Sequence, residues 1–412
     1  MRKLCMNAVL LAMVAIADWQ SNGMPTEQGS RTLSHALDSI AEAHSIVGLS
    51  VAIVCPDSLL FSYSRGQAQL GRAIAMTETT YVRIASVSKV LTAVALLQLH
   101  EKGKFKLDDD VSKALGFTFR NPYFPDVPIT YRQLLQHTSS LLSDEQQPVP
   151  YYVLWRDPTL ALQDVLSKNG KRYQDSIYYS LWAKEAPGKK FAYSNLGYAL
   201  LGTLVEIHSG ERFDQYCNTH IFKPLGFACS FNLQDIPPEK VAYPYRLIDG
   251  KWTAQVDSVR TLFPLDNYAV GSNALLFSPQ GGLRISAREL ATLAQVFLNG
   301  GKLRETRILS ESQLLQMEKD SLKTGNPFIA KYAMGLHHTS NVLTGIEMTG
   351  HLGQAYGLLS GWYYTRQHGI GIAVIITGGL YKETGEEFYD VERKIYAAIQ
   401  AYLQATQQLS SR

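Results

Sequence analysis

A serine and a lysine three positions apart, Ser86 and Lys89, are the pair whose types and spacing best suit covalent catalysis. They open an apolar run with helical spacing, which predicts a helix from Ser86 to about Lys102. Residues three apart on a helix lie on the same face. We therefore expect the hydroxyl and the amine to face each other from a rigid, otherwise apolar element.

This pairing suits nucleophilic catalysis through an acyl-enzyme. A serine hydroxyl is a weak nucleophile until a base takes its proton. A lysine can be that base when burial lowers its pKa, because desolvation disfavours the ammonium form. Unpaired backbone N–H groups at the helix start would stabilise an oxyanion beside Ser86. The alternative is a surface serine with a solvated lysine, since Ser-x-x-Lys arises by chance on the order of once or twice in a chain this long.

Two further stretches offer the remaining groups that such a reaction needs. Tyr193-Ser194-Asn195 lies in a predicted turn before a helix, so both outer side chains can project into a cleft. A tyrosine near two cations can have a pKa low enough to exchange protons. His351-Leu352-Gly353 ends a predicted strand, where glycine lets a substrate backbone approach closely. The N–H of Gln354 could bind the same oxyanion as the N–H of Ser86.

The elements that must position these groups come from both ends of the chain. Helices are predicted over 30–46 and 387–406, and strands over 48–54, 59–63, 332–337, 346–351, 358–365 and 369–377. Helical patterns fill the middle, over 110–115, 130–137, 158–168, 174–183, 195–207, 210–222 and 287–298, with another helix capped near Ser310. The region from 142 to 152 is expected to be a surface loop.

This order predicts an α/β (α+β) fold. One antiparallel sheet, built from both chain ends and flanked by helices, would carry an all-helical insertion beside it. The boundaries expected are 30–112 with 285–408 for the α/β part, and 113–284 for the mainly helical insertion. A cleft between the two parts is a natural place for a site.

The N-terminus has the pattern of a secretory signal peptide over residues 1–17. Arg2 and Lys3 supply the charged start, an apolar stretch follows, and Ala15-Ile16-Ala17 gives the small-x-small cleavage pattern. The alternative is a membrane anchor, but about 14 apolar residues are too few to span a bilayer comfortably. We therefore expect a periplasmic or extracellular protein without a stable membrane span after signal cleavage.

Composition narrows the partners. The chain has 39 basic and 36 acidic residues and a net charge of +3, with no basic run, so no nucleic-acid partner is expected. Of four cysteines, Cys5 lies in the signal; Cys217 and Cys229 could pair in an oxidising compartment, or stay as buried thiols. No cysteine and histidine cluster has metal-site spacing, so no metal or other cofactor is expected.

Three ordered motifs give the chain a resemblance to a known family. Ser86-Val87-Ser88-Lys89, Tyr193-Ser194-Asn195 and His351-Leu352-Gly353 follow the pattern Ser-x-x-Lys, Tyr-x-Asn and Lys/His-x-Gly. This pattern resembles the class C β-lactamases, the related D-alanyl-D-alanine carboxypeptidases and D-aminopeptidases, and the esterases on the same fold. The surroundings of these motifs also resemble that family, as do residues 134–139 and Gly281-Gly282-Leu283, and the resemblance covers about residues 31–400.

The resemblance implies a β-lactamase/D,D-peptidase-like fold and a role for each motif. Ser86 would be the acylated nucleophile, with Lys89 and Tyr193 sharing the base and acid work. Asn195 would hold the acyl amide of the substrate, and His351 would support the third wall of the site. The function implied is an exported serine hydrolase, with D,D-peptidase-like activity first, an esterase second and a β-lactamase third.

The substrate would be a small molecule or short peptide: a D-amino-acid peptide, a β-lactam or an ester. A rival of another class is a non-catalytic protein of the same fold that binds muropeptides or serves assembly. It would be favoured by a broken motif, whereas all three motifs are intact.

Two departures and several decoys accompany the resemblance. His351 replaces the lysine of true β-lactamases, so a substrate carboxylate would be held less by charge. Ser140 stands where the family usually has glycine, which indicates a local backbone adjustment. Three decoys are set aside: Lys323-Thr324-Gly325, expected in a loop; Tyr216-Cys217-Asn218, expected in a helix; and His137, expected to be structural. Tyr356 is a candidate for lining the pocket, whereas Trp362 is expected in the core.

Overall fold

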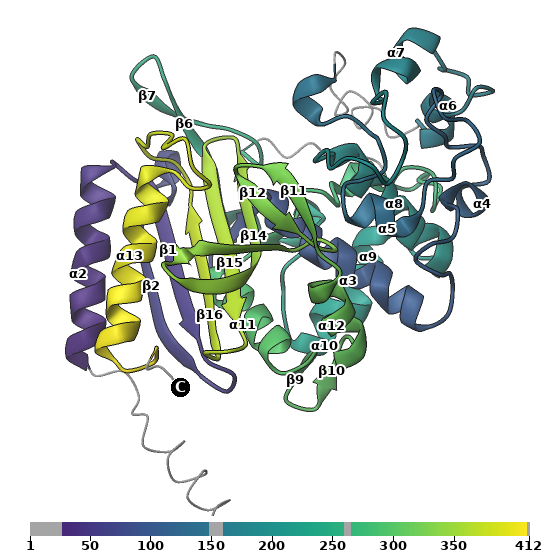
Figure 1. Ribbon diagram of the computed structural model, residues 1–412. Helices are drawn as coiled ribbons and strands as arrows, with labels where there is room; N and C mark the ends of the chain where they lie inside the picture. Colours follow the sequence, from purple (N-terminus) through teal and green to yellow (C-terminus); the bar gives the residue numbers. More distant parts are fainter. Residues whose placement is uncertain (1–26, 148–159, 259–264, 410–412) are drawn as a thin grey trace, which may run out of the picture.

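A large antiparallel sheet organises the molecule (Figure 1). The computed structural model describes residues 27–147, 160–258 and 265–409. The nine strands run in the order β11-β12-β13-β14-β15-β16-β1-β2-β3. They are β1 (Gly48–Val54), β2 (Leu59–Gln69), β3 (Ile74–Ala75), β11 (Leu322–Asn326), β12 (Ile329–Tyr332), β13 (His337–Leu343), β14 (Ile346–Ala355), β15 (Leu358–Thr365) and β16 (Ile370–Ile376). The junction of the two chain ends is the antiparallel pair β1–β16, so the predicted sheet is confirmed.

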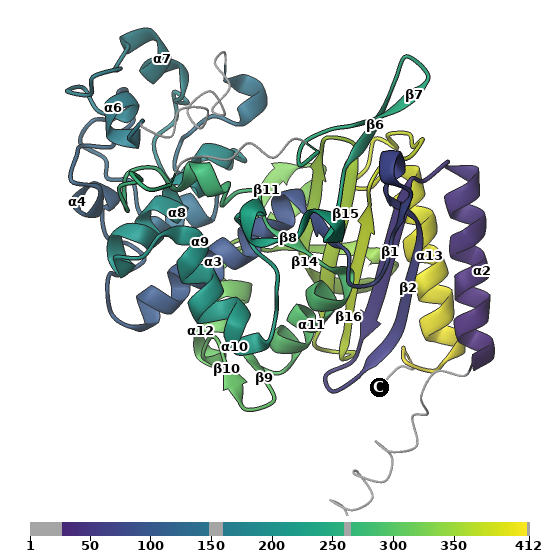
Figure 2. The same cartoon turned by 180° about the vertical axis from the view of Figure 1, so that it is seen from behind.

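Helices cover both faces of this sheet. Helices α2 (Glu27–Ala43) and α13 (Asp390–Ala405) lie side by side on one face, and α11 (Ala287–Leu298) packs on the other (Figures 1 and 2). Side chains alternate along a strand. Leu49, Val51 and Ile53 of β1 therefore pack with α2 and α13. Ala52 and Val54 of the same strand belong to a second hydrophobic core, which includes residues of α11 and α3. This packing confirms the predicted mixed α/β architecture.

Helix α3 (Ser88–Glu101) is buried in the middle of the molecule. All its residues from Ser88 to Leu99 are buried, as expected for a helix that is apolar on every side. Strand β4 (Tyr81–Arg83) and a 3₁₀ turn, η2 (Ala85–Val87), lead into it. The prediction that the α-helix begins at Ser86 is therefore wrong by two residues. Ala85 has φ +46°, which bends the chain into a tighter turn at this point.

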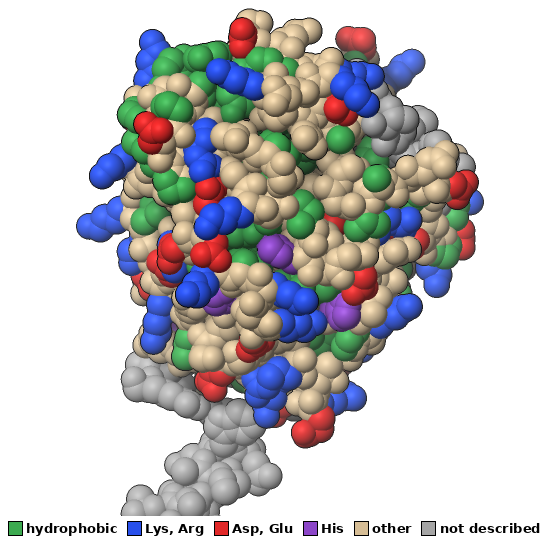
Figure 3. All heavy atoms as spheres, turned by 90° about the vertical axis from the view of Figure 1, so that its right-hand side faces the viewer, with side chains coloured by type: hydrophobic (Ala, Val, Ile, Leu, Met, Phe, Trp, Pro, Cys, Tyr) green, Lys and Arg blue, Asp and Glu red, His purple; other side chains and the backbone are tan. Residues whose placement is uncertain are grey.

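Helices dominate the middle of the chain, as predicted, but most are shorter than the patterns suggested. They are α4 (Val111–Leu115), α5 (Tyr131–Leu135), α6 (Leu162–Leu166), α7 (Asp175–Ser180), α8 (Asn195–Ser209), α9 (Phe213–Cys217), α10 (Lys223–Leu225) and, after α11, α12 (Glu311–Lys319). On the face that Figure 3 shows, basic and acidic side chains are interspersed. The division of the chain at residues 113 and 284 stays a prediction.

Short strands complete the structure. They are β5 (Val241–Ala242), β6 (Tyr245–Ile248), β7 (Lys251–Ala254), β8 (Arg284–Ile285), β9 (Lys302–Leu303) and β10 (Thr306–Arg307). Strand β4 lies between β5 and β8, which ties the segment before Ser86 to two distant parts of the chain.

Two local predictions are wrong, both near the free edge of the sheet. A strand was expected over 332–337, but Gly335 has φ +81° and residues 333–336 turn the chain between β12 and β13. Lys323-Thr324-Gly325 was expected in a loop, but it lies in β11. Leu322 pairs with Tyr332, so 322–332 form a hairpin whose tip holds Pro327 and Phe328.

The expected signal peptide, residues 1–17, lies outside the described residues. Among the described helices, none combines the length and apolarity that crossing a bilayer requires. Cys217 and Cys229 are both buried free thiols, so the open question of their pairing is answered in favour of thiols.

Candidate active site

The structure brings Ser86 and Lys89 together at the start of α3. The Nζ atom of Lys89 donates a hydrogen bond of 3.2 Å to Oγ of Ser86. Ser86 is half-buried and lines a cleft, whereas Lys89 is fully buried beneath it. The predicted spacing along the helix therefore gives the expected contact, although Ser86 precedes the α-helix.

Two oxygen atoms hold the Lys89 amine in place. Nζ lies 2.8 Å from the carbonyl oxygen of Gln280 and 2.5 Å from Oδ1 of Asn195. Burial, opposed by attraction to Asp144, lowers the pKa of Lys89 to about 7. An amine with this pKa is about half uncharged at pH 7 and mostly uncharged above it, so it can accept a proton in this pH range.

Tyr193 lies against the same amine. Lys89 Nζ is 4.8 Å from the centroid of the Tyr193 ring, so this tyrosine of the second motif lies close to the Ser86–Lys89 pair. The His137 ring packs against the Tyr193 ring, with centroids 4.3 Å apart, and its Nδ1 accepts a 3.0 Å hydrogen bond from the Ser194 N–H. His137 is buried and its pKa is held well below the usual value by burial and by Lys89. It supports the turn that carries Tyr193, in agreement with the expected structural role.

Asn195 begins α8, and Ser194 caps that helix through a side-chain bond to the Gly197 N–H. The side-chain amide of Asn195 is hydrogen-bonded through both its oxygen and its nitrogen. Oδ1 accepts from Lys89, while Nδ2 donates to a carboxylate oxygen of Asp144. The Asn195 N–H donates to the other carboxylate oxygen at 3.2 Å.

Asp144 is the site residue that sequence analysis missed. It opens a short 3₁₀ turn (Asp144–Gln146) in the segment expected to be a surface loop. Burial raises the pKa of its carboxyl group, against the hydrogen bonds from Asn195 and the attraction of Lys89. An aspartate in a polar loop carries no periodic signal, so only the fold reveals its place beside Asn195.

His351, on β14, forms part of the cleft wall. Its Nδ1–H donates to the Leu352 carbonyl at 2.5 Å, and Nε2 accepts from the Tyr332 hydroxyl at 3.2 Å. Burial, reinforced by Lys89, lowers the pKa of His351 to about 3. The imidazole is therefore neutral at every ordinary pH, as the replacement of lysine by histidine suggested.

Gly353 lets β14 lie directly against the turn that holds the serine. A Cβ atom at this position would be 2.4 Å from the Ile84 carbonyl oxygen and 3.1 Å from the Ser86 nitrogen. Ser360, the β15 partner of Gly353, donates to the same Ile84 carbonyl at 2.8 Å. Gln354 follows, lines the cleft and bonds through its side chain to the Tyr389 hydroxyl.

The cleft above these groups has a volume of about 980 Å³. Its walls include Ser86, Tyr193, Asn195, His351 and Gln354, together with residues 142–146, 182–186 and 324–329. The hairpin that carries Lys323-Thr324-Gly325 therefore borders the site through Thr324 and Gly325, whereas the lysine that contacts Ser86 is Lys89. Trp362 is in the core, as predicted, and Tyr356 is not among the described residues that line the cleft.

The remaining departure, Ser140, and the decoy Tyr216-Cys217-Asn218 both have local explanations. Ser140 has φ +65°, the left-handed region that favours glycine, and its Oγ accepts a 3.0 Å hydrogen bond from the Asn121 amide. Tyr216 lies in α9 and is almost fully buried, so the second Tyr-x-Asn sequence is part of a helix, as expected.

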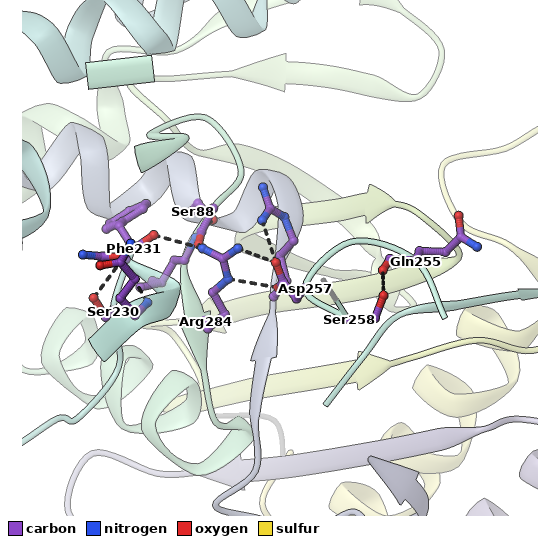
Figure 4. Close-up of polar contacts among 12 residues, drawn as sticks. Ser88, Ser230, Phe231, Gln255, Asp257, Ser258 and Arg284 are labelled. Atoms are coloured by element: carbon purple, nitrogen blue, oxygen red, sulfur yellow. Dashed lines mark hydrogen bonds and ion pairs between the residues drawn. The ribbon is translucent and has the colours of Figure 1, made fainter. Parts of the chain in front are cut away.

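A buried charged cluster links β4, which leads to Ser86, with β8; Figure 4 shows its members Asp257 and Arg284. Arg284 of β8 donates to both carboxylate oxygens of Asp257, at 2.5 and 3.0 Å, and Arg83 of β4 lies 3.4 Å from the same group. Although burial opposes ionisation, the two arginines hold the pKa of Asp257 below its usual value. Strand β4 leads to Ser86, and β8 follows the turn that offers the Gln280 carbonyl to Lys89.

Comparison with known proteins places this geometry in a family. The family model described as Beta-lactamase matches residues 33–393. The chain is 26% identical over 203 residues to Protein flp of Staphylococcus aureus (strain MW2), covering 48% of this chain and 38% of that protein. It is 29% identical over 201 residues to D-alanyl-D-alanine-carboxypeptidase/endopeptidase AmpH of Escherichia coli (strain K12), covering 48% and 49%. The matches thus span less than half the length of these relatives.

The fold has solved counterparts. The D-amino acid amidase from Ochrobactrum anthropi SV3, complexed with L-phenylalanine amide, superposes with a TM-score of 0.67. At 21% identity, this likeness covers 93% of this chain and all of that one, and it shows a shared fold. Because the family model spans most of the chain, the protein belongs to the β-lactamase family of serine hydrolases.

Proposed function

We propose that the protein is an exported serine hydrolase that forms an acyl-enzyme on Ser86 and has D,D-peptidase-like activity. Its substrates would be D-amino-acid peptides, cleaved in the manner of a D-alanyl-D-alanine carboxypeptidase or a D-aminopeptidase. The observation that carries this proposal is the 3.2 Å contact between the Ser86 hydroxyl and a buried amine whose pKa is about 7. The similarity to AmpH and to a D-amino acid amidase supports the substrate class.

Acylation would follow from this contact. The uncharged Lys89 amine takes the Ser86 proton as Oγ attacks the substrate carbonyl carbon, which gives a tetrahedral intermediate. The N–H groups of Ser86 and Gln354 are proposed to bind the oxyanion of that intermediate. Tyr193 then passes a proton to the leaving amine as the bond between carbon and nitrogen breaks, and it regains a proton from the Lys89 ammonium. Water attacks the ester in the reverse sequence and restores the free Ser86 hydroxyl.

The remaining site residues would place the substrate. Asn195, whose side chain is already fixed by Lys89 and Asp144, would hold the acyl part through its amide. Gly353 would act indirectly, because its lack of a side chain lets β14 lie against the Ser86 turn, and the substrate backbone would lie along the β14 residues that line the cleft, Leu352 and Gln354. His351 would support this wall as a neutral hydrogen-bonding group rather than as a charge.

An esterase is the second candidate function. The neutrality of His351 favours it, because this wall offers no positive charge to a substrate carboxylate. Hydrolysis of β-lactams ranks third, since a peptidase or esterase without a water placed to attack the β-lactam acyl-enzyme would keep the β-lactam bound. A non-catalytic muropeptide-binding or assembly protein would not need the buried, neutral amine beside Ser86.

A substrate panel tests the proposal. Purified wild-type protein, Ser86→Ala and the control Ser312→Ala are assayed with D-alanyl peptides and amides, p-nitrophenyl acetate and a chromogenic cephalosporin. Ser312 is exposed on α12, so its variant controls for the loss of a serine hydroxyl. We expect turnover of D-amino-acid substrates by wild type and Ser312→Ala only. Tight binding of these substrates without turnover by wild type would instead favour the binding protein.

Export is proposed from the N-terminal pattern of a charged start, an apolar stretch and Ala15-Ile16-Ala17. Mass spectrometry of the protein recovered from outside the inner membrane should show a mature N-terminus at Asp18. Recovery of the full-length chain from the cytoplasm alone would contradict export.

A further inference from the structure

A two-residue turn, Tyr356-Gly357, joins β14 to β15 beside the cleft. Both residues have positive φ, +57° and +83°, as in the two-residue turns that hairpins favour. Gln354 faces Leu359, one pair beyond the pair that closes the turn. Antiparallel partners alternate between pairs that exchange hydrogen bonds and pairs that do not, and the closing pair exchanges them. The N–H of Gln354 therefore points away from β15. In the described structure, β13 pairs with β14 as far as Gly350, so this N–H lies outside the sheet ladder.

The side chain of Gln354 is anchored at the start of α13. Its Nε2 atom donates to the hydroxyl oxygen of Tyr389, the residue that precedes this helix. The Tyr389 backbone N–H donates in turn to Oε2 of Glu392 at 3.0 Å, and Glu392 is buried. Burial and the charge of Glu383 raise the pKa of Tyr389, against the hydrogen bond from Gln354, so its hydroxyl is protonated at neutral pH. A neutral tyrosine that is fixed at its backbone therefore holds the Gln354 amide.

A second tyrosine ties the same turn to the same segment. The Tyr381 hydroxyl donates to the Gly357 carbonyl oxygen at 3.0 Å, and the Tyr381 and Tyr389 rings meet edge to face with centroids 4.9 Å apart. Two hydrogen bonds of 2.8 and 3.1 Å between Lys382 and Asp390 close this segment on itself. The turn after β14 thus has two hydrogen-bonded attachments to the start of α13.

We propose that Tyr389 is a positioning residue for the reaction, because it fixes Gln354 and so orients the Gln354 N–H toward the oxyanion. This inference rests on the proposed function and adds a group that is not among the described residues lining the cleft. An oxyanion donor acts by being in place before the charge develops, so a small displacement lowers the rate without weakening substrate binding. Loss of the Tyr389 hydroxyl should therefore lower kcat and leave KM almost unchanged.

The alternative is that Tyr389 only stabilises the start of α13. Its loss would then lower the free energy of unfolding and leave kcat of the folded enzyme intact. A double-mutant cycle separates the two roles, because an effect that passes through Gln354 disappears once the Gln354 amide has been removed. Gln354→Leu removes that amide, keeps the backbone N–H and changes an exposed side chain.

The test measures kcat and KM for p-nitrophenyl acetate with wild type, Tyr389→Phe, Gln354→Leu and the double variant. Acylation and deacylation both pass through an oxyanion, so kcat is sensitive to the donor whichever step limits it. We expect kcat to fall about tenfold in Tyr389→Phe, with KM changed less than about twofold. Gln354→Leu should lose a similar factor, and the double variant should lose less than about twofold more than Gln354→Leu.

Tyr402→Phe is the matched control. It removes a hydroxyl from the same helix, one that donates to the Leu60 carbonyl oxygen at 3.2 Å, far along α13 from the cleft residues. Its kcat should change less than about twofold. Circular dichroism checks that each variant is folded.

Phenylboronic acid gives a second readout of the same donor. The Ser86 oxygen bonds to boron as Lys89 takes the hydroxyl proton, which gives a tetrahedral anion with an oxygen at the oxyanion position. Its inhibition constant should rise in Tyr389→Phe by the factor by which kcat falls. A role in stability alone would leave the inhibition constant unchanged.

Unchanged kcat in Tyr389→Phe, or losses that multiply in the double variant, would overturn the inference and leave the nucleophile untouched. Ester turnover that persists in Ser86→Ala would instead refute the proposed function, and with it the basis of the inference. A wild-type protein that neither turns over the ester nor binds the boronic acid would refute both.

Discussion

The side-chain nitrogen of Lys89 lies 3.2 Å from the hydroxyl oxygen of Ser86, and burial holds the pKa of that amine at about 7. In the proposed mechanism the neutral amine is the base, so kcat/KM for an uncharged ester should rise about tenfold per pH unit below 7 and level off above it. The measurement is a pH profile of p-nitrophenyl acetate hydrolysis between pH 5 and 9. A flat profile across this range would contradict a titrating base.

The same lysine should make stability depend on pH. Between pH 7 and 10.5 the unfolded chain keeps a proton that the folded chain has released, so the free energy of unfolding rises with pH. The Lys89→Met variant has no titrating amine at this position, so it lacks this pH dependence. The unfolding free energy of wild type minus that of Lys89→Met should therefore increase by about 2 kcal/mol from pH 7 to pH 9. Urea unfolding at both pH values measures it, and a constant difference would indicate an ordinary lysine pKa.

Tyr193 is predicted to act as the proton relay to the leaving group. Tyr193→Phe keeps the ring against Lys89 and His137 but removes the hydroxyl, so kcat for D-alanine p-nitroanilide should fall by about 10²–10⁴ with little change in KM. Tyr356→Phe is the control, since Tyr356 is not among the described cleft residues, and its kcat should change less than twofold. A Tyr193→Phe enzyme with wild-type kcat would assign the relay elsewhere.

The buried Asp257 cluster should matter for stability. Asp257→Ala leaves Arg83 and Arg284 without this carboxylate in a buried environment, which should cost about 3–5 kcal/mol in unfolding free energy. The matched control is Glu347→Gln, which breaks an exposed ion pair with Lys331 and should cost less than about 1 kcal/mol. Chemical denaturation monitored by tryptophan fluorescence compares them. Equal effects would show that the buried cluster adds no more stability than the exposed ion pair.

Much of the fold follows from periodicity in the sequence. The bounds of α11 and β1 match the predicted ranges, because a capping serine, Ser286, and a run of apolar residues define them locally. The hairpin of β11 and β12 was missed because its residues alternate weakly and most are exposed at the sheet edge. The turn at Ser86 was misplaced because the positive φ of Ala85 is imposed by packing rather than by residue type.

The residues of the candidate site likewise fall into those that the sequence predicted and those that it did not. Ser86, Lys89, Tyr193, Asn195 and His351 stand in local motifs, and the structure gathers them at one cleft. Asp144 and the Gln280 carbonyl have no motif, because their place depends on contacts with Asn195 and Lys89 from distant parts of the chain. Long-range packing therefore supplied what spacing could not predict.

The most direct test of the whole account is the chemical identity of the acylated residue. Wild-type protein is incubated with a fluorescent penicillin, digested, and the labelled peptide is sequenced by mass spectrometry, with Ser86→Ala treated in parallel. The predicted result is one penicilloyl adduct on Ser86 in wild type and an unlabelled Ser86→Ala protein that remains folded by circular dichroism. Label on a different residue, or undiminished label on folded Ser86→Ala, would contradict the assignment of Ser86 as the nucleophile.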